Sequence, residues 1–350
     1  MKVKLEDVCI RDSSNLKQSD VLGKEGKYPV YGAAGYIGNV EFYHQKKSYV
    51  AVVKDGAGIG RTLICPAKSS VIGTMQYLLP KENILPEYLY YIVRYMHLEK
   101  YYTGATIPHI YFKDYKVEKF NLDSIDRQYN IINILGKCEK IINIRQKEIE
   151  KLDNLIKARF VEMFGDENNS KNWKIVNIED VADVQVGVVI KPSQYYTDES
   201  KGIRAFRSLN IGEGYIKDSD WVYFTEEGHQ KNKKSILKEN DLLIVRSGTP
   251  GTTCVVTKEY EGYNAIDIII AHPNCKKVNP YYLCEYTNMP HGKRKITEGT
   301  GGAAQQHFNV GKYNKIQLML PPMELQNQFA DFVHQVNKSK VVVSNTLYYN

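Results

Sequence analysis

The chain of 350 residues contains the same series of motifs twice, and this internal repeat constrains its fold more than any other feature. Self-similarity of this kind is the signature of a duplicated structural unit. Because the motifs recur in the same order, the sequence predicts a tandem duplication with diverged insertions. The matching segments are KLEDVC (4–9) with NIEDVA (177–182), SYVAVVKDGAGIGRT (48–62) with DLLIVRSGTPGTT (241–253), LPEYLYYIVR (85–94) with VNPYYLCEYTN (278–288), YTGATIPHIYFKDY (102–115) with EGTGGAAQQHFNVGKY (298–313), and IDRQYNIINIL (125–135) with MELQNQFADFV (323–333).

Each half begins with short β-like runs and ends with a helical pattern. Runs such as YVAVV, TLIC, LLIV and TCVV are separated by Gly and Pro, which is typical of twisted, mostly antiparallel sheets with short helices between them. Residues 126–164 contain no Pro and a single Gly, and apolar residues recur there every three or four positions, with Arg145 as the polar exception. This heptad pattern predicts one long helix, which at 1.5 Å per residue would extend about 60 Å.

The second half starts a helix with the same heptad register, so we expect the two apolar stripes to pack on each other. The predicted fold is α+β, with two β-rich domains separated by two long helices in an antiparallel coiled coil and related by a pseudo-two-fold axis. The alternative is an ordinary core helix in each of two independent domains. The second stripe stops at Asn350, so the distal helix is expected to be truncated relative to the first. The expected segments are a β-rich domain at 1–123, the long helix at 124–165, a second β-rich domain at 166–321 and the distal helix at 322–350.

The apolar stripes supply the candidates for helix packing and for docking of partner proteins. They are Ile131, Leu135, Ile142, Ile149, Leu152, Ile156, Phe329, Phe332 and Val336.

Motifs for catalysis, cofactors and metals are absent, so no catalytic, cofactor-binding or metal-ligating residues are predicted. The six cysteines include no CxxC pair and the histidines no HxH or HxxxH spacing, which argues against zinc and favours reduced thiols in a cytoplasmic protein. The Gly-rich segment 54–62 leads into a β-like run rather than a helix, which predicts a hairpin turn and not a phosphate-binding loop. Asn279-Pro280-Tyr281-Tyr282 is similar to an adenine-methyltransferase signature, but it occupies the position of a helix start. A Ser-His-Asp or Cys-His site is neither supported nor excluded.

The charge and hydropathy patterns bear on the partners. Lys and Arg exceed Asp and Glu by 47 to 40, a net charge of +7 that permits a polyanionic partner. The sequence has neither an apolar run of about 18 residues nor a secretory signal, so no membrane association is expected.

Clusters of basic and amide side chains predict a surface for double-stranded DNA. Lys and Arg neutralise phosphates, and Arg, Asn and Gln form bidentate hydrogen bonds with base edges. A solvated surface charge is the alternative for each cluster. The candidates are Lys54 and Arg61 in the first Gly-rich turn, Arg246 in the second, Arg204, Arg207, Lys231, Lys233, Lys234, Lys293, Arg294 and Lys295 nearby in the second half, and Gln305, Gln306 and His307 after a Gly-rich stretch.

The order of β-rich domain, long helix, β-rich domain and second helix resembles the specificity subunit of type I restriction–modification systems, over nearly the whole chain. The segment LMLPPMELQNQFADFV (318–333) is similar to the Leu-Pro-Pro entry to that family's conserved helix, with Gln326 in the glutamine position. The first copy lacks both prolines but keeps Gln128 at the equivalent place. KARFVEMFGD (157–166) is similar to the end of the family's central helix.

This resemblance implies a subunit without catalytic activity. Each β-rich domain would be a target-recognition domain for one half of a split DNA sequence, and the helices would set the spacer between the halves. The helical region would dock two methyltransferase subunits, with motor–nuclease subunits completing the complex. S-adenosylmethionine, ATP and Mg would belong to those partners, and none to this chain. The alternatives are a DNA methyltransferase or nuclease with an unrecognised site, and a coiled-coil scaffold that binds no DNA.

Overall fold

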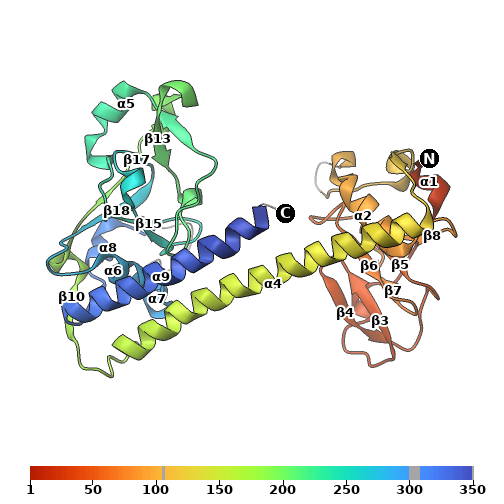
Figure 1. Cartoon of the computed structure of the whole chain (residues 1–350), viewed down its shortest axis with the longest axis horizontal. Helices are drawn as coiled ribbons and strands as arrows, with labels where there is room; N and C mark the ends of the chain where they lie inside the picture. The colour runs from red at the N-terminus through yellow and green to blue at the C-terminus, as the bar shows by residue number, and fades with distance from the viewer. Residues whose placement is uncertain (105–106, 299–307, 349–350) are drawn as a thin grey trace. The chain divides into compact units, whose positions relative to one another are not determined.

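The computed structural model describes residues 1–104, 107–298 and 308–348, with the backbone alone for 344–348. The chain forms two compact units, residues 1–143 (unit 1) and 144–350 (unit 2). The boundary lies inside the helix α4 (Ile125–Phe164), which is continuous through it (Figure 1). Residues of this one helix therefore belong to both compact units.

Unit 1 is built on a four-stranded antiparallel sheet with strand order β2-β8-β5-β6. Its central strand β5 is buried at every position, because the helix α2 covers one face and a second, three-stranded sheet lies in the same unit. The sequence of β5, YVAVV, is accordingly a continuous apolar run. The bounds are β2 (Cys9–Ser13), β8 (Met75–Pro80), β5 (Tyr49–Val53), β6 (Thr62–Cys65) and α2 (Pro86–Tyr95), and in the second sheet β4 (Gly35–Val40), β3 (Tyr28–Gly32) and β7 (Ser70–Val71).

Unit 2 repeats this plan. Its main sheet has the antiparallel order β11-β18-β15-β16, and a second sheet has the order β12-β14-β13-β17. The helices α6 and α8 correspond to α2 and to the short α3 (Phe112–Tyr115) of unit 1. The bounds are β11 (Ala182–Val186), β18 (Ile268–Pro273), β15 (Leu242–Val245), β16 (Thr253–Val255), β12 (Tyr196–Thr197), β14 (Val222–Phe224), β13 (Ile203–Phe206), β17 (Asn264–Ala265), α5 (Glu226–Lys231), α6 (Pro280–Asn288), α7 (Pro290–Glu298) and α8 (Val310–Asn314).

The strand pairings confirm the internal repeat. In each unit the second sheet contains a parallel pair, β3 with β7 and β13 with β17. A two-stranded antiparallel ladder then joins the start of each β-rich region to its end: β1 (Lys2–Lys4) pairs with β9 (Lys119–Asn121), and β10 (Lys174–Asn177) with β19 (Gln317–Leu320). Each ladder lies directly before a long helix, so the chain leaves a β-rich domain close to where it entered. The short helix α1 (Leu5–Val8) follows the first of these ladders.

Two local predictions are also confirmed. Both Gly-rich segments are turns of antiparallel hairpins, between β5 and β6 and between β15 and β16. The Asn-Pro-Tyr-Tyr segment is a helix start, because Asn279 is the N-cap of α6 and its Oδ1 accepts from the backbone N–H of Tyr281 at 2.9 Å. A side-chain oxygen at this position satisfies a helix N–H that has no partner in the helix.

The second long helix, α9 (Met323–Tyr348), runs antiparallel to the part of α4 in unit 2 (Figure 1). Asp153 of α4 forms an ion pair with Lys340 of α9. The Arg159 guanidinium lies 5.9 Å from the ring centroid of Phe332, and further along α4 the Phe164 ring contacts Phe329. Residue numbers thus rise along α4 as they fall along α9, and the predicted antiparallel pairing is confirmed.

The apolar stripe of α4 contacts different partners along its length. Ile131 packs against the core of unit 1, and Leu152 and Ile156 against the core of unit 2. Ile142, near the unit boundary, is 46% exposed, and Leu135 and Ile149 are half-buried. The stripe is therefore not one continuous seam with α9.

Unit 2 also buries aromatic residues that the heptad pattern did not single out. Phe160 and Phe164 are fully buried between α9 and α6, where the Phe160 ring stacks on Tyr282 at 5.6 Å. On α9, Val333 is more deeply buried than Phe332. A helix that faces two neighbours needs a wider apolar stripe than a coiled-coil seam, which accounts for these additional positions.

The glutamine shared by the two helix entries has the same structural task in both. Gln128 is fully buried; its Oε1 accepts from Leu85 N at 2.9 Å, and its Nε2 donates to Asp123 O at 2.9 Å. Gln326 is equally buried; its Oε1 accepts from Asn279 N at 2.8 Å, and its Nε2 donates to Pro321 O at 2.8 Å. Leu85 and Asn279 are the N-caps of α2 and α6. Each glutamine therefore connects the start of a long helix to the start of the helix that covers the sheet.

Replacing Gln128 by Ala should destabilise unit 1 by about 2–3 kcal/mol, because buried backbone groups would lose their hydrogen bonds. The measurement is the free energy of unfolding from urea titrations of the full chain. Gln146→Ala is the matched control, since Gln146 lies on the same helix but is exposed; it should change stability by less than about 0.5 kcal/mol. Equal losses for the two variants would contradict the anchoring role.

Candidate nucleic-acid interface

The two hairpin turns present cations that are held by neighbouring groups. In unit 1, Lys54 Nζ lies 3.4 Å from the carboxylate of Asp55, and Arg61 Nη1 donates to Ala33 O at 3.0 Å. In unit 2, Arg246 Nε lies 3.5 Å from Asp267 Oδ1, and the Arg246 side chain is only 14% exposed. A largely buried guanidinium beside a carboxylate has less freedom than an exposed ammonium, and its planar donor array matches a base edge.

The second sheet of unit 2 presents another oriented guanidinium. Arg204 lies over the indole ring of Trp221, 5.6 Å from the ring centroid, and 3.5 Å from Asp218 Oδ1. Arg207, at the end of β13, donates to the backbone carbonyl of Asp220. The structure thus brings Arg204 and Arg207 to one segment, next to an aromatic cluster that includes Phe206 and Trp221.

The lysines at and after α5 are more exposed and less fixed in orientation than these arginines. Lys231 forms an ion pair with Glu227 one turn earlier in the helix, at 2.6 Å, and Lys233 and Lys234 are exposed. Exposed ammonium groups on long side chains can neutralise phosphates but are not oriented toward a particular base. These residues remain candidates for contacts with the DNA backbone alone.

The basic cluster on α7 has partners within unit 2. Lys293 forms an ion pair with Glu213, Arg294 with Glu167, and Lys295 Nζ donates to Gln317 O at 3.0 Å. Burial lowers the pKa of Lys295 below its usual value. These contacts hold α7 in place. Contact of the three residues with DNA stays a prediction.

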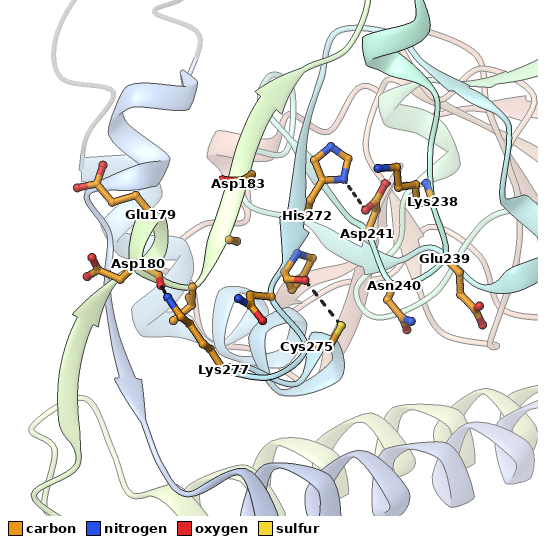
Figure 2. Close-up of a pocket in the computed structure, with 14 residues that line it drawn as sticks. Glu179, Asp180, Asp183, Lys238, Glu239, Asn240, Asp241, His272, Cys275 and Lys277 are labelled. Carbon is orange, nitrogen blue, oxygen red and sulfur yellow. Dashed lines mark hydrogen bonds and ion pairs between the residues drawn. The ribbon is translucent and has the colours of Figure 1, made fainter.

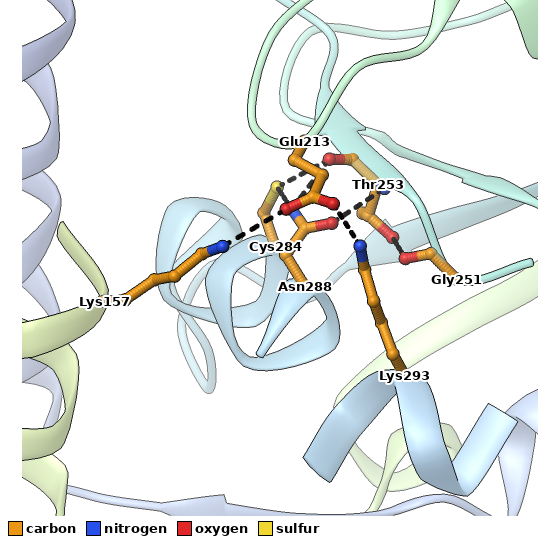
Figure 3. Close-up of polar contacts among 7 residues, drawn as sticks. All are labelled: Lys157, Glu213, Gly251, Thr253, Cys284, Asn288 and Lys293. Atoms are coloured by element: carbon orange, nitrogen blue, oxygen red, sulfur yellow. Dashed lines mark hydrogen bonds and ion pairs between the residues drawn. The ribbon is translucent and has the colours of Figure 1, made fainter. Parts of the chain in front are cut away.

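Figure 3 shows how the loop between β13 and β14 of unit 2 is connected to the long helix α4. Glu213, from the loop between β13 and β14, lies between Lys293 of α7 and Lys157 of α4, whose Nζ is 3.5 Å away. Beside it, Thr253 of β16 donates its backbone N–H to Asn288 Oδ1 at 3.0 Å and accepts from Asn288 Nδ2 at 2.9 Å. Glu213 therefore joins the β13–β14 loop to α4 and α7, and Asn288 of α6 holds β16 beside it.

A buried carboxyl lies next to this network. Burial raises the pKa of Glu285 to about 7, although Lys340 and Lys157 act in the opposite direction. A carboxyl group with a pKa near 7 can gain or lose its proton near neutral pH when its surroundings change slightly.

Unit 2 has an acidic cavity of about 470 Å³ beside β11 and β18, drawn in Figure 2. His272 Nδ1 lies 2.6 Å from Asp241 Oδ1 there, and Lys277 Nζ donates to Asp180 O at 2.9 Å. Carboxylates outnumber ammonium groups in its lining, so it would repel phosphates. The acidic residues are Glu179, Asp180, Asp183, Glu239 and Asp241.

The part of the chain that the structure describes has no group of His, Cys, Asp and Glu arranged to hold a metal ion. The six cysteines are free thiols, and burial raises the pKa of Cys9 and Cys65 to about 12, which disfavours a reactive thiolate. Within the described residues, no helix has the length and apolar character needed to cross a membrane.

Sequence reasoning missed the pair formed by Asp55 and His109, whose Oδ1 and Nδ1 atoms are 2.7 Å apart. The signal that could have singled out His109 was the repeat, because it aligns His109 with His307. Gln305, Gln306 and His307 themselves lie outside the described residues.

Comparison with known proteins identifies the family. The family model for the type I restriction modification DNA specificity domain matches residues 1–154 and again residues 170–347. This chain belongs to that family. The two matches coincide with the two copies of the repeat, and the predicted resemblance is confirmed. Members of the family are DNA-recognition components of restriction–modification complexes, not their catalytic subunits.

Individual relatives agree with this assignment. The chain is 24% identical over 311 residues to the type I restriction enzyme MjaVIII specificity subunit of Methanocaldococcus jannaschii, covering 82% of this chain and 72% of the relative. It is 19% identical to the MjaIX specificity subunit of the same organism, covering 73% of this chain and 63% of that one. A specificity (S) subunit structure from M. genitalium superposes on 100% of this chain and 92% of its own, with a TM-score of 0.60 and 14% identity. A chain from a structural study of assembly of the type I system gives a TM-score of 0.52 at 14% identity, covering 100% and 93%.

We predict that Arg246→Ala weakens binding to the cognate DNA sequence about 10–100-fold, the usual cost of losing one bidentate base contact. Binding to random duplex should change much less. Lys234→Ala is the comparison, and its exposed ammonium should contribute weakly and equally to both DNAs. Affinities would be measured by fluorescence anisotropy at one fixed salt concentration. Equal losses on cognate and random DNA for both variants would refute a base-reading role for Arg246.

Proposed function

We propose that this specificity-family chain recognises a split, asymmetric DNA sequence, with one β-rich domain for each half. The observation that carries the proposal is the structural repeat. Both units have the same strand order in the main sheet, a buried glutamine bonded to the N-cap residue of the covering helix, and a cation in the same hairpin turn, Lys54 or Arg246. The sequences of the two turns differ, which is what two readers of different half-sites require.

The long helices are proposed to set the spacer between the half-sites. Helix α4 begins against the core of unit 1 and ends in the core of unit 2. At 1.5 Å per residue, its 40 residues give it a length of about 60 Å. A duplicated reader whose two copies are joined by one helix of defined length would select targets by half-site separation as well as by sequence.

We further propose that the chain performs no chemistry and acts through partners. Two methyltransferase subunits would dock on the helical region, and motor–nuclease subunits would complete the restricting complex. S-adenosylmethionine would be bound by the methyltransferase subunits, with methylation of an adenine flipped from the duplex, and ATP and Mg by the motor–nuclease subunits. The complex would work in the cytoplasm.

The decisive experiment is to map methylated adenines in the genome of a cell that carries this chain with methyltransferase partners. We expect one bipartite motif with a fixed spacer, which disappears when the chain is removed. An unsplit motif, or methylation that does not depend on the chain, would overturn the proposal.

Two measurements on the isolated chain separate the alternatives. Isothermal titration with S-adenosylmethionine should give no binding, and tight binding would favour a methyltransferase. Affinity for duplex DNA should fall steeply with salt concentration, because phosphate contacts release counterions. A scaffold that binds no DNA would show no such dependence.

Insertion of seven residues into α4 between Asn143 and Ile144 should lengthen the preferred spacer by about three base pairs. The insert adds about 10 Å, and it preserves the helix faces because seven residues make nearly two turns. The control replaces seven exposed residues at the same place without changing the length. The readout is the motif from methylation mapping, and an unchanged spacer would show that the helix does not determine the separation.

A further inference from the structure

In unit 1, the backbone of His109 is fixed between two extended segments. His109 N donates to Thr103 O at 2.8 Å, and Thr103 N donates to His109 O at 2.9 Å. On the other side, Ile110 N donates to Lys54 O and Gly56 N to Pro108 O, both at 2.9 Å. His109 therefore lies in a small ladder that joins the hairpin turn after β5 to the segment before α3, and its position does not depend on a ligand.

The side chain of His109 is also oriented. Asp55 Oδ1 lies 2.7 Å from Nδ1 of the ring, and the other oxygen of the same carboxylate lies 3.4 Å from Lys54 Nζ. A carboxylate accepts only, so Nδ1 carries a proton and Nε2 faces the other way. The ring is 35% exposed. It therefore presents a nitrogen of fixed direction that accepts a hydrogen bond when the imidazole is neutral and donates one when it is protonated.

The groups around His109 suit the edge of a DNA groove. Ile107 is 56% exposed and Tyr111 is 49% exposed. The Tyr111 ring lies nearly parallel to the His109 ring, and Lys113 Nζ is 5.4 Å from the Tyr111 centroid. An exposed aliphatic side chain can contact a thymine methyl, an oriented nitrogen can contact a base edge, and the lysines can contact phosphates.

The same backbone connection occurs in unit 2. Phe308 N donates to Arg246 O at 3.3 Å, as Ile110 N does to Lys54 O, and both Ile110 and Phe308 are buried. The hairpin cation and the following segment are thus joined at the same point in both copies. The backbone that holds the hairpin turn against the following segment is therefore a shared feature of the two copies, and the cation at the turn differs, Lys54 in one and Arg246 in the other.

From these contacts we propose that Lys54, Asp55, Ile107, His109 and Tyr111, the histidine surface, contact one DNA half-site, and that His109 reads a base edge there. The proposal rests on the proposed function and adds the site within unit 1. His109 determines specificity, Asp55 positions its ring, and Lys54 contributes a phosphate contact while holding Asp55.

The test uses the full chain assembled with its methyltransferase partners, with methylation mapping as the readout. His109→Ala should relax base preference at one or two positions of one half-site and leave the other half-site unchanged. Cognate affinity should fall about 10–100-fold, and affinity for random duplex should stay within about two-fold because the surface keeps its lysines. Lys54→Ala should instead weaken binding to both DNAs and reduce the salt slope by about one.

His97→Ala is the matched control, because His97 forms the other histidine–carboxylate pair among the described residues of unit 1. Its Nδ1 lies 3.2 Å from Glu99 Oε1, and its ring is 73% exposed. This variant should keep the wild-type motif. If His109→Ala lowers the amount of folded protein, His109→Gln retains a polar side chain of similar length, and it should change the preferred base in the same half-site.

The possible outcomes separate a failure of the proposed function from a failure of the histidine surface alone. If the wild-type complex methylates no bipartite motif, the proposed function itself fails. If the wild-type motif is bipartite and both His109 variants retain it in full, the histidine surface is not a base reader and only this inference is overturned.

Discussion

Each long helix begins at a buried glutamine, and the attachment of the β-rich domains depends on this side chain. A primary amide can donate and accept at once, so Gln128 and Gln326 each satisfy backbone groups of two different segments. One segment is the entry to the long helix, and the other is the N-cap of the helix that covers the sheet. Because buried backbone groups are costly to leave unpaired, the helix cannot move relative to that sheet without losing these bonds.

At the other end of α4, the attachment is apolar. Phe160 and Phe164 are buried against Phe329 of α9 and Tyr282 of α6. Aromatic rings packed edge to face bury a large area in a defined geometry. The ion pairs of Glu213 with Lys157 and Lys293 connect α4 and α7 to the loop between β13 and β14. Helix α4 therefore contributes buried side chains to the core of unit 2 and packs Ile131 and Ile132 against the core of unit 1.

The charged residues separate into two classes once their contacts are known. Arg246, Arg204 and His109 are oriented by a carboxylate or an aromatic ring and remain partly accessible. The basic residues of α7 form ion pairs or hydrogen bonds with groups inside unit 2. Net charge could not make this distinction, because a lysine contributes the same formal charge whether it meets a phosphate or a glutamate. Side-chain environment is therefore the better guide to the DNA surface.

Much of the fold was predictable from the sequence, because the information is local or repeated. The heptad stripe predicted α4, Pro280 predicted the start of α6, and the duplicated motifs predicted two units of one plan with a glutamine at each helix entry. The tertiary structure alone decided which face of α4 meets α9 and which meets α6, so Phe160 and Val333 were not singled out in advance. It also brought together Asp55 and His109, which are far apart in the sequence. Periodicity records that a side chain is buried, whereas its partner depends on contacts between distant segments that only the folded chain brings together.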